Sequence, residues 1–165
     1  MTAKTEIIQS LRSIPWFLEL KTHQIDQLVD IAQLRLYEAG EEIFAEGQRA
    51  NDLYIILDGQ VKLISYVPSF GEMIIFHAEP LDIIGWTSMT SFVRQRTSSA
   101  SAVISTHLLV FNGSALRKLC DQDHDLGYVI MKRMSNVIAS HLLTTRLHLY
   151  DLLQQNMPET HQKPV

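Results

Sequence analysis

The spacing of hydrophobic positions divides the chain into helical ends and a middle with a shorter period. Residues 5–12 predict a short helix, and residues 21–35 place apolar side chains at helical spacing, with Thr22 as the expected N-cap. Another short helix is predicted at 113–120. Residues 126–153 contain no proline and predict one long helix. The termini are therefore expected to be helical.

The middle of the chain carries short apolar runs separated by glycines, a pattern typical of β-strands. Residues 52–66 contain two such runs joined at Asp58 and Gly59, which predicts a β-hairpin. Further strands are predicted at 71–78, 99–105 and 107–112. This close and regular spacing predicts a mainly-β domain, an antiparallel sandwich or barrel, flanked by the helices.

Composition and charge argue against several classes of function. The chain has 165 residues, which suggests one domain, and 46% of them are hydrophobic, enough for a core. Its 14 basic and 18 acidic residues give a net charge of −4, which argues against a nucleic-acid ligand. Cys120 is the only cysteine, so an intrachain disulfide is excluded. Without a signal peptide or a membrane-spanning apolar stretch, we expect a soluble, cytoplasmic protein that does not bind membranes.

The long predicted helix carries a seam of residues at alternating steps of three and four. These residues are Ser135, Ile138, Leu142, Thr145, Leu149 and Leu152. Such a seam is typical of helices that pair with a second copy, with Thr145 as a polar residue near its middle. The alternative is that this face packs on the chain's own strands. We expect a homodimer through this helix.

Four stretches of the chain carry a resemblance to a known family. They are AGEEIFAEGQRANDLYIILDGQVKL (39–63), GEMIIF (71–76), IIGWTSMTSFVRQRTSSASAV (83–103) and HLLVF (107–111). In these stretches the chain resembles the cyclic-nucleotide-binding domain of cyclic-AMP receptor and Fnr-type transcription regulators and of kinase regulatory subunits. The resemblance implies an antiparallel β-roll or jelly-roll barrel (a double-stranded β-helix) with N-terminal helices and a long C-terminal helix. We therefore expect a sensor domain at 1–155 and a polar tail at 156–165.

In that family, the stretch that matches 83–103 binds the cyclic phosphate. The resemblance implies that Gly85 allows the backbone to approach the phosphate, that Arg96 pairs with its charge and that Thr97 supplies a hydroxyl group. Thr87 and Ser88 offer further hydroxyl groups. An arginine taken alone would more often pair with a surface carboxylate, but this motif favours the anion. The implied ligand is cyclic AMP or cyclic GMP, and no cofactor is required.

Two positions depart from the family pattern. Trp86 stands where the family has a glutamate that holds the ribose 2′-hydroxyl, and Leu81 replaces a glycine in the preceding turn. The phosphate half of the motif is therefore kept while the ribose half is lost. Trp86 could stack on a ring of the ligand, or it could fill the pocket and keep it empty.

Thr145 has two candidate roles. Alignment with cyclic-AMP receptors places it where a threonine of the long helix contacts the adenine of the ligand. It also lies in the predicted dimer seam, where a polar residue sets the register. Both roles stay open at this point.

Three hypotheses for function follow. The first is a regulatory module, not an enzyme, that binds a cyclic nucleotide or another phosphorylated small molecule and signals through the long helix to a protein partner. The second is a degenerate domain in which Trp86 blocks the site and the chain is a dimerisation or protein-interaction adaptor. The third is a cupin-like metal enzyme, which the lack of any His-x-His pair argues against. No winged helix-turn-helix follows the long helix in this sequence, so we expect no direct binding to DNA.

Overall fold

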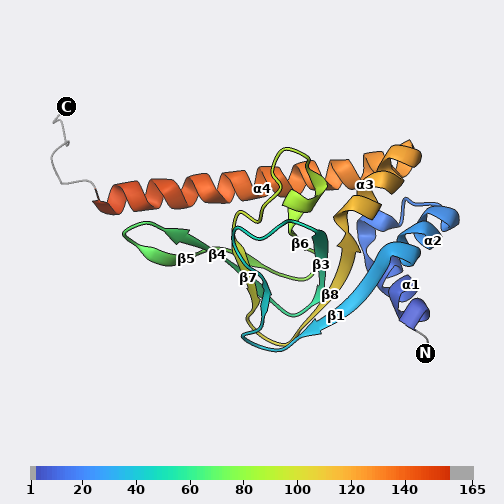
Figure 1. The fold of residues 1–165 in the computed structure, drawn as a ribbon, viewed down its shortest axis with the longest axis horizontal. Coiled ribbons are helices and arrows are strands. Elements are labelled where there is room, and N and C mark those ends of the chain that lie inside the picture. The colour runs from blue at the N-terminus through green and yellow to red at the C-terminus, as the bar shows by residue number, and fades with distance from the viewer. Residues whose placement is uncertain (1–2, 157–165) are drawn as a thin grey trace.

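The structure is a computed structural model that describes residues 3–156, with helices at both ends and strands between them (Figure 1). The helices are α1 (Ala3–Ser13), the 3₁₀ helix η1 (Pro15–Phe17), α2 (Thr22–Ile31), the 3₁₀ helix η2 (Trp86–Met89), α3 (Gly113–Gln122) and α4 (His124–Asn156). The strands are β1 (Ala32–Tyr37), β2 (Glu42–Phe44), β3 (Asp52–Asp58), β4 (Val61–Val67), β5 (Gly71–Ala78), β6 (Ile83–Ile84), β7 (Ser99–Ala102) and β8 (Thr106–Asn112). Residues 157–165 of the predicted polar tail lie outside the described residues.

The strands form two four-stranded antiparallel sheets, in the orders β1-β8-β3-β6 and β2-β7-β4-β5. Side chains alternate along β3, as the pleat of a strand requires. Tyr54 and Ile56 belong to the core between the two sheets, and Leu53 and Ile55 belong to the core between the first sheet and the helices. Strands β3 and β8 of the first sheet are thus buried on both faces, and the predicted mainly-β class with flanking helices is confirmed.

The β-hairpin predicted at residues 52–66 is wrong in its pairing. Both strands exist, but β3 pairs with β6 and β8, while β4 pairs with β5 and β7. The turn therefore carries the chain from one sheet to the other. Gly59 has a φ of +99°, and a Cβ there would collide with Thr106. The Thr106 hydroxyl accepts a hydrogen bond from the Gln60 N–H at 3.1 Å, so the turn is closed by β8 and not by pairing between β3 and β4.

The second predicted helix ends earlier than its hydrophobic pattern indicated. The prediction ran to residue 35, but α2 ends at Ile31 and residues 32–37 form β1, which pairs along β8. Sheet pairing here outweighs local helix propensity. Thr22 is not the N-cap either, since it is the first helical residue after Lys21, whose N–H donates to the Gln24 side chain at 2.9 Å.

The long helix α4 confirms the longest predicted element, and its two halves have different surroundings (Figure 1). Its first half buries Leu126, Ile130, Met134 and Val137 in the core shared with α1, α2 and the first sheet. Its second half runs beside β4 and β5, as Figure 1 shows. No helix among residues 3–156 is both long enough and apolar enough to cross a membrane.

Candidate ligand-binding site

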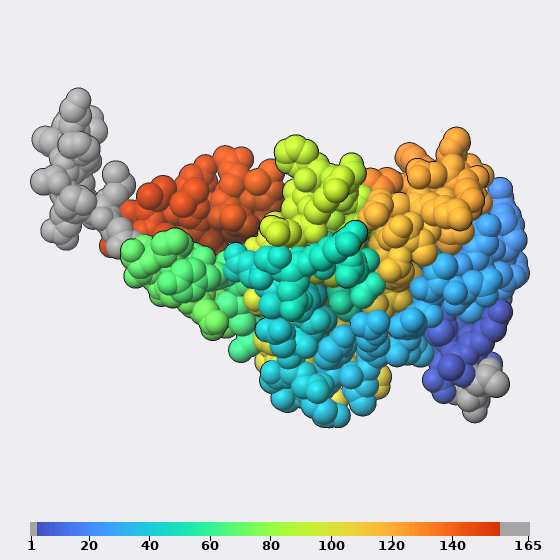
Figure 2. Space-filling view, in the orientation of Figure 1, coloured from blue at the N-terminus to red at the C-terminus, as the bar shows by residue number. Residues whose placement is uncertain are grey.

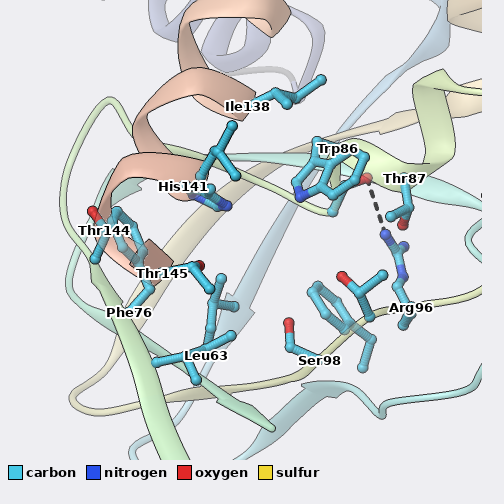
Figure 3. Close-up of a pocket in the computed structure, with 15 residues that line it drawn as sticks. Leu63, Phe76, Trp86, Thr87, Arg96, Ser98, Ile138, His141, Thr144 and Thr145 are labelled. Atoms are coloured by element: carbon cyan, nitrogen blue, oxygen red, sulfur yellow. Dashed lines mark hydrogen bonds between the residues drawn. The ribbon is translucent and has the colours of Figure 1, made fainter. Parts of the chain in front are cut away.

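A cavity of about 310 Å³ lies between the second sheet and α4 (Figure 3). Three parts of the chain line it: the strands (Phe44, Leu63, Ile75, Phe76), the stretch around η2 and β7 (Gly85, Trp86, Thr87, Arg96, Thr97, Ser98) and α4 (Ile138, His141, Leu142, Thr144, Thr145). We call it the α4 cavity. Its size suits a small ligand, since binding pockets begin at about 300 Å³.

Six of the seven predicted site residues line the α4 cavity. They are Gly85, Trp86, Thr87, Arg96, Thr97 and Thr145. Ser88 is not among the lining residues. Its hydroxyl is buried without a hydrogen-bond partner among the described residues, and its carbonyl accepts a hydrogen bond from Arg117 of α3.

Gly85 is required by its conformation and by its neighbours. Its φ of +76° lies in the left-handed region, and it precedes η2 directly. A Cβ at this position would lie 2.6 Å from Nη1 of Arg96 and 2.9 Å from the carbonyl oxygen of Asp52. The short helix expected after Gly85 is present as η2, and its first backbone N–H groups have no intrahelical acceptor.

Arg96 is buried, with 4% of its surface exposed, and it is held by main-chain oxygens. Nη1 donates to the Gly85 carbonyl at 3.0 Å (Figure 3), and Nη2 donates to the Asp52 carbonyl at 2.7 Å. The guanidinium also lies over the Phe44 ring, 4.3 Å from its centroid, and 5.5 Å from the centroid of Tyr54. The sequence motif identified this residue, but not these partners.

The charge of Arg96 has no carboxylate partner among residues 3–156, because none of the ion pairs there includes it. Burial is the largest influence on its pKa and lowers it, although the guanidinium stays charged. Its Nε is buried and has no hydrogen-bond partner in the part of the chain that the structure describes. A buried cation with unused donors favours an anionic ligand.

Three hydroxyl residues lie on the same wall of the α4 cavity. Thr87 is 3% exposed and its Oγ1 has no hydrogen-bond partner in the described part of the chain. Thr97 is exposed, and Ser98 is buried. Ser98 was not among the predicted site residues. Its two-residue spacing from Arg96 was the available signal.

Trp86 forms part of the wall of the α4 cavity. The side chain is half-buried and packs against the core between the first sheet and the helices. Figure 3 shows the indole ring near Ile138, with Arg96 on its other side. The cavity volume of about 310 Å³ is measured with the ring in this position, so the indole does not fill the cavity.

His141 was missed as a site residue and lines the cavity from α4. Its ring lies 4.5 Å from that of Phe76, centroid to centroid. Burial lowers the pKa of His141, and the carboxylate of Asp82 opposes that effect more weakly. The helical spacing from Ile138 to His141 and Thr145 was the signal that could have identified it. Among residues 3–156, no three His, Cys, Asp or Glu side chains gather as a metal site.

The sequence model of the cyclic nucleotide-binding domain matches residues 34–123, more than half of the chain. The chain belongs to the cyclic nucleotide-binding domain family. The matched range begins within β1 and contains the other seven strands, η2 and Arg96, while α4 lies beyond it. This confirms the family that the sequence motifs indicated.

Relatives in this family share sequence and fold with the chain. A CRP-like cAMP-activated global transcriptional regulator from Mycobacterium tuberculosis is 29% identical over 123 residues, 74% of this chain and 52% of that protein. The cyclic AMP receptor protein of Thermus thermophilus is 27% identical over 128 residues, 75% of this chain and 59% of that protein. A cyclic nucleotide-binding domain from Methylobacillus flagellatus superimposes with a TM-score of 0.73 at 23% identity, covering 96% of this chain and 86% of that one. The chain spans about half the length of the curated relatives it matches.

Proposed function

We propose that this domain is a regulatory sensor, without enzymatic activity, that binds cyclic AMP or cyclic GMP in the α4 cavity. The observation that carries the proposal is the buried guanidinium of Arg96, which reaches the cavity wall and has no carboxylate partner in the described chain. A cyclic phosphate carries one negative charge and would supply the missing partner. The printed names of the relatives include a cAMP-activated regulator and a cyclic AMP receptor, which supports this ligand class.

In this proposal the phosphate would lie between Arg96 and the start of η2. There it would accept hydrogen bonds from free Arg96 donors, from the backbone N–H groups after Gly85 and from the Thr87 hydroxyl. Thr97 and Ser98 add donors from the segment just before β7. This arrangement uses polar groups that have no partner in the described residues, including Arg96 Nε and Thr87 Oγ1.

The rest of the ligand would lie between Trp86 and α4. An indole face offers stacking to a purine base, and Thr145 offers a hydroxyl from the opposite wall. No carboxylate lines the described cavity to hold a ribose hydroxyl. We therefore infer an affinity that depends on the base and the phosphate, and only weakly on the 2′-hydroxyl.

Signalling is proposed to run through α4. Ile138, Leu142 and Thr145 line the cavity and also belong to the predicted dimer seam, so a ligand would contact the residues that a second copy would meet. Binding would then shift the packing of a homodimer and alter a protein partner in the cytoplasm, by differential affinity for two states. Direct DNA contact is not part of this proposal.

Isothermal titration calorimetry with cyclic AMP and cyclic GMP tests the proposal. We expect saturable binding that Thr97→Ala weakens and that Ser101→Ala leaves unchanged. Ser101 lies on the same strand region but does not line the cavity. Arg96→Gln should abolish binding, with its folding checked by circular dichroism because it also loses two main-chain contacts.

The competing proposal is an adaptor in which Trp86 blocks the site. It predicts no heat with either nucleotide for the parent chain. Binding that appears only in Trp86→Ala would mean that the indole ring closes a site that is otherwise intact. Saturable binding by the parent chain would exclude the adaptor.

A further inference from the structure

A second cavity, of about 240 Å³, lies on the other side of η2 from the α4 cavity and has a different chemistry. Three segments far apart in the sequence form it: residues 49–51, residues 87–94 and the start of α3. Figure 2 shows the yellow-green η2 segment beside the gold of α3 and above the blue-green strands. We call it the basic cavity.

Three arginines line the basic cavity: Arg49, Arg94 and Arg117. None of its described lining residues is acidic, and none of the ion pairs among residues 3–156 includes these arginines. The whole chain carries a net charge of −4, so this concentration of positive charge is local. Guanidinium groups without carboxylates repel one another and favour an anion that joins them.

The arginines keep donors free for such an anion. Arg117 uses one N–H on the Ser88 carbonyl, and Arg94 makes a single 3.5 Å contact from Nε to the Ser91 carbonyl. No hydrogen bond of the Arg49 side chain occurs within the described residues. Hydroxyl and amide groups complete the lining, from Thr87, Thr90, Ser91, Ser114, Asn51 and Asn112.

The two cavities differ in charge, so we expect them to bind different anions. The α4 cavity offers one arginine and mostly apolar walls, which suits the single charge of a cyclic phosphate and its base. The basic cavity offers three arginines and mostly polar groups, which suits an anion with more than one charge and many acceptor oxygens.

We propose that the basic cavity binds a diphosphate group, as free pyrophosphate or as part of a nucleoside diphosphate. Thr87 lines both cavities, so the two ligands would sit on opposite sides of η2. The hydrogen bond from Arg117 to the Ser88 carbonyl joins α3 to η2. An anion that binds Arg117 would therefore contact η2 through this bond, from the side away from the α4 cavity. This inference does not depend on the proposed function of the α4 cavity.

Calorimetric titration of the full chain with pyrophosphate tests the proposal. We expect one site per chain, weakened roughly tenfold by Arg49→Gln and by Arg94→Gln, since each removes a charge-assisted contact. Both side chains are exposed, so their removal leaves the core intact. Arg12→Gln is the matched control: it removes the same charge from exposed α1, and it should change the affinity by less than twofold.

Further titrations separate the sources of the anion. Equal affinity for pyrophosphate and for a nucleoside diphosphate would show that the diphosphate alone is recognised. Tighter binding of the nucleotide would indicate an additional contact with the base. Either result supports the proposal. Absence of pyrophosphate binding, or an equal loss in Arg12→Gln, would overturn it. Tighter binding of a phosphoserine peptide than of pyrophosphate would also overturn it, because the site would then be a protein-docking surface.

Discussion

The guanidinium of Arg96 donates to the carbonyl oxygen of Gly85 across 3.0 Å, and the missing side chain of Gly85 is what makes room for it. The same guanidinium reaches the Asp52 carbonyl at 2.7 Å. One side chain thus joins η2 to β3 at the wall of the α4 cavity. The geometry of the candidate site and the stability of the fold are linked at this point.

Gly85→Ala should destabilise the domain far more than the matched substitution Gly40→Ala. Both glycines have positive φ, +76° and +87°, so both variants carry a left-handed strain of about 1–2 kcal/mol. Of the two, only Gly85 has neighbours within 4 Å of the added Cβ. Displacing Arg96 should therefore bring the loss in the free energy of unfolding for Gly85→Ala to about 3 kcal/mol or more. Urea unfolding of the two variants measures the difference. Equal losses would mean that Arg96 moves aside freely.

The part of the site that sequence analysis could predict is the part encoded by local spacing. Gly85, Arg96 and Thr97 stand in one short motif, and five of the six predicted site residues that line the cavity come from that motif. The Asp52 carbonyl lies 44 residues away in sequence, so its contact with Arg96 follows only from strand pairing. His141 was missed because its helical spacing from Ile138 and Thr145 indicates a shared face of α4 but not the cavity that this face lines.

Trp86 should report ligand in the α4 cavity by its fluorescence. The chain has two tryptophans, and Trp16 lies elsewhere, against the Phe17 ring at 4.0 Å. Addition of cyclic AMP should quench or shift the emission of the parent chain and of Trp16→Phe. In Trp86→Phe the ligand should leave the emission unchanged, because the remaining indole does not line the cavity. A response that persists in Trp86→Phe would place the ligand near Trp16 instead.

In the fold, too, features set by neighbouring residues could be predicted from the sequence, and features set by distant residues could not. Strand β5 was predicted with its observed bounds, because its pattern and its glycine are local. The turn at Asp58 and Gly59 has the sequence of a hairpin, yet it connects two sheets. The choice depends on β8, which closes the turn through Thr106 and lies 46 residues from Gln60. Local turn chemistry therefore identified a reversal without fixing its partners.

Leu149→Glu should weaken self-association of the chain, and Leu147→Glu should not. The two side chains lie on the same half of α4 with similar exposure, 51% and 54%, so both variants add the same charge at a similarly open position. Only Leu149 belongs to the predicted seam, where a buried glutamate would oppose pairing. Analytical ultracentrifugation over a range of concentrations measures the dimer constant. A larger effect of Leu147→Glu would place the interface on another face of α4.

His141 should make the stability of the domain depend on pH in one direction. Burial lowers its pKa below the ordinary value of 6.5, so the folded state favours the neutral ring and the unfolded state binds the proton more readily. Stability from this group is therefore complete above that value and is lost as the pH falls through the folded pKa. Urea unfolding at about pH 8 and about pH 5.5 should show a smaller loss at acid pH in His141→Gln than in the parent chain. His148 is exposed on the same helix, so the control variant His148→Gln should lose as much stability at acid pH as the parent chain. An unchanged acid loss in His141→Gln would mean that another group carries the pH dependence and that the ring beside Phe76 is protonated without cost.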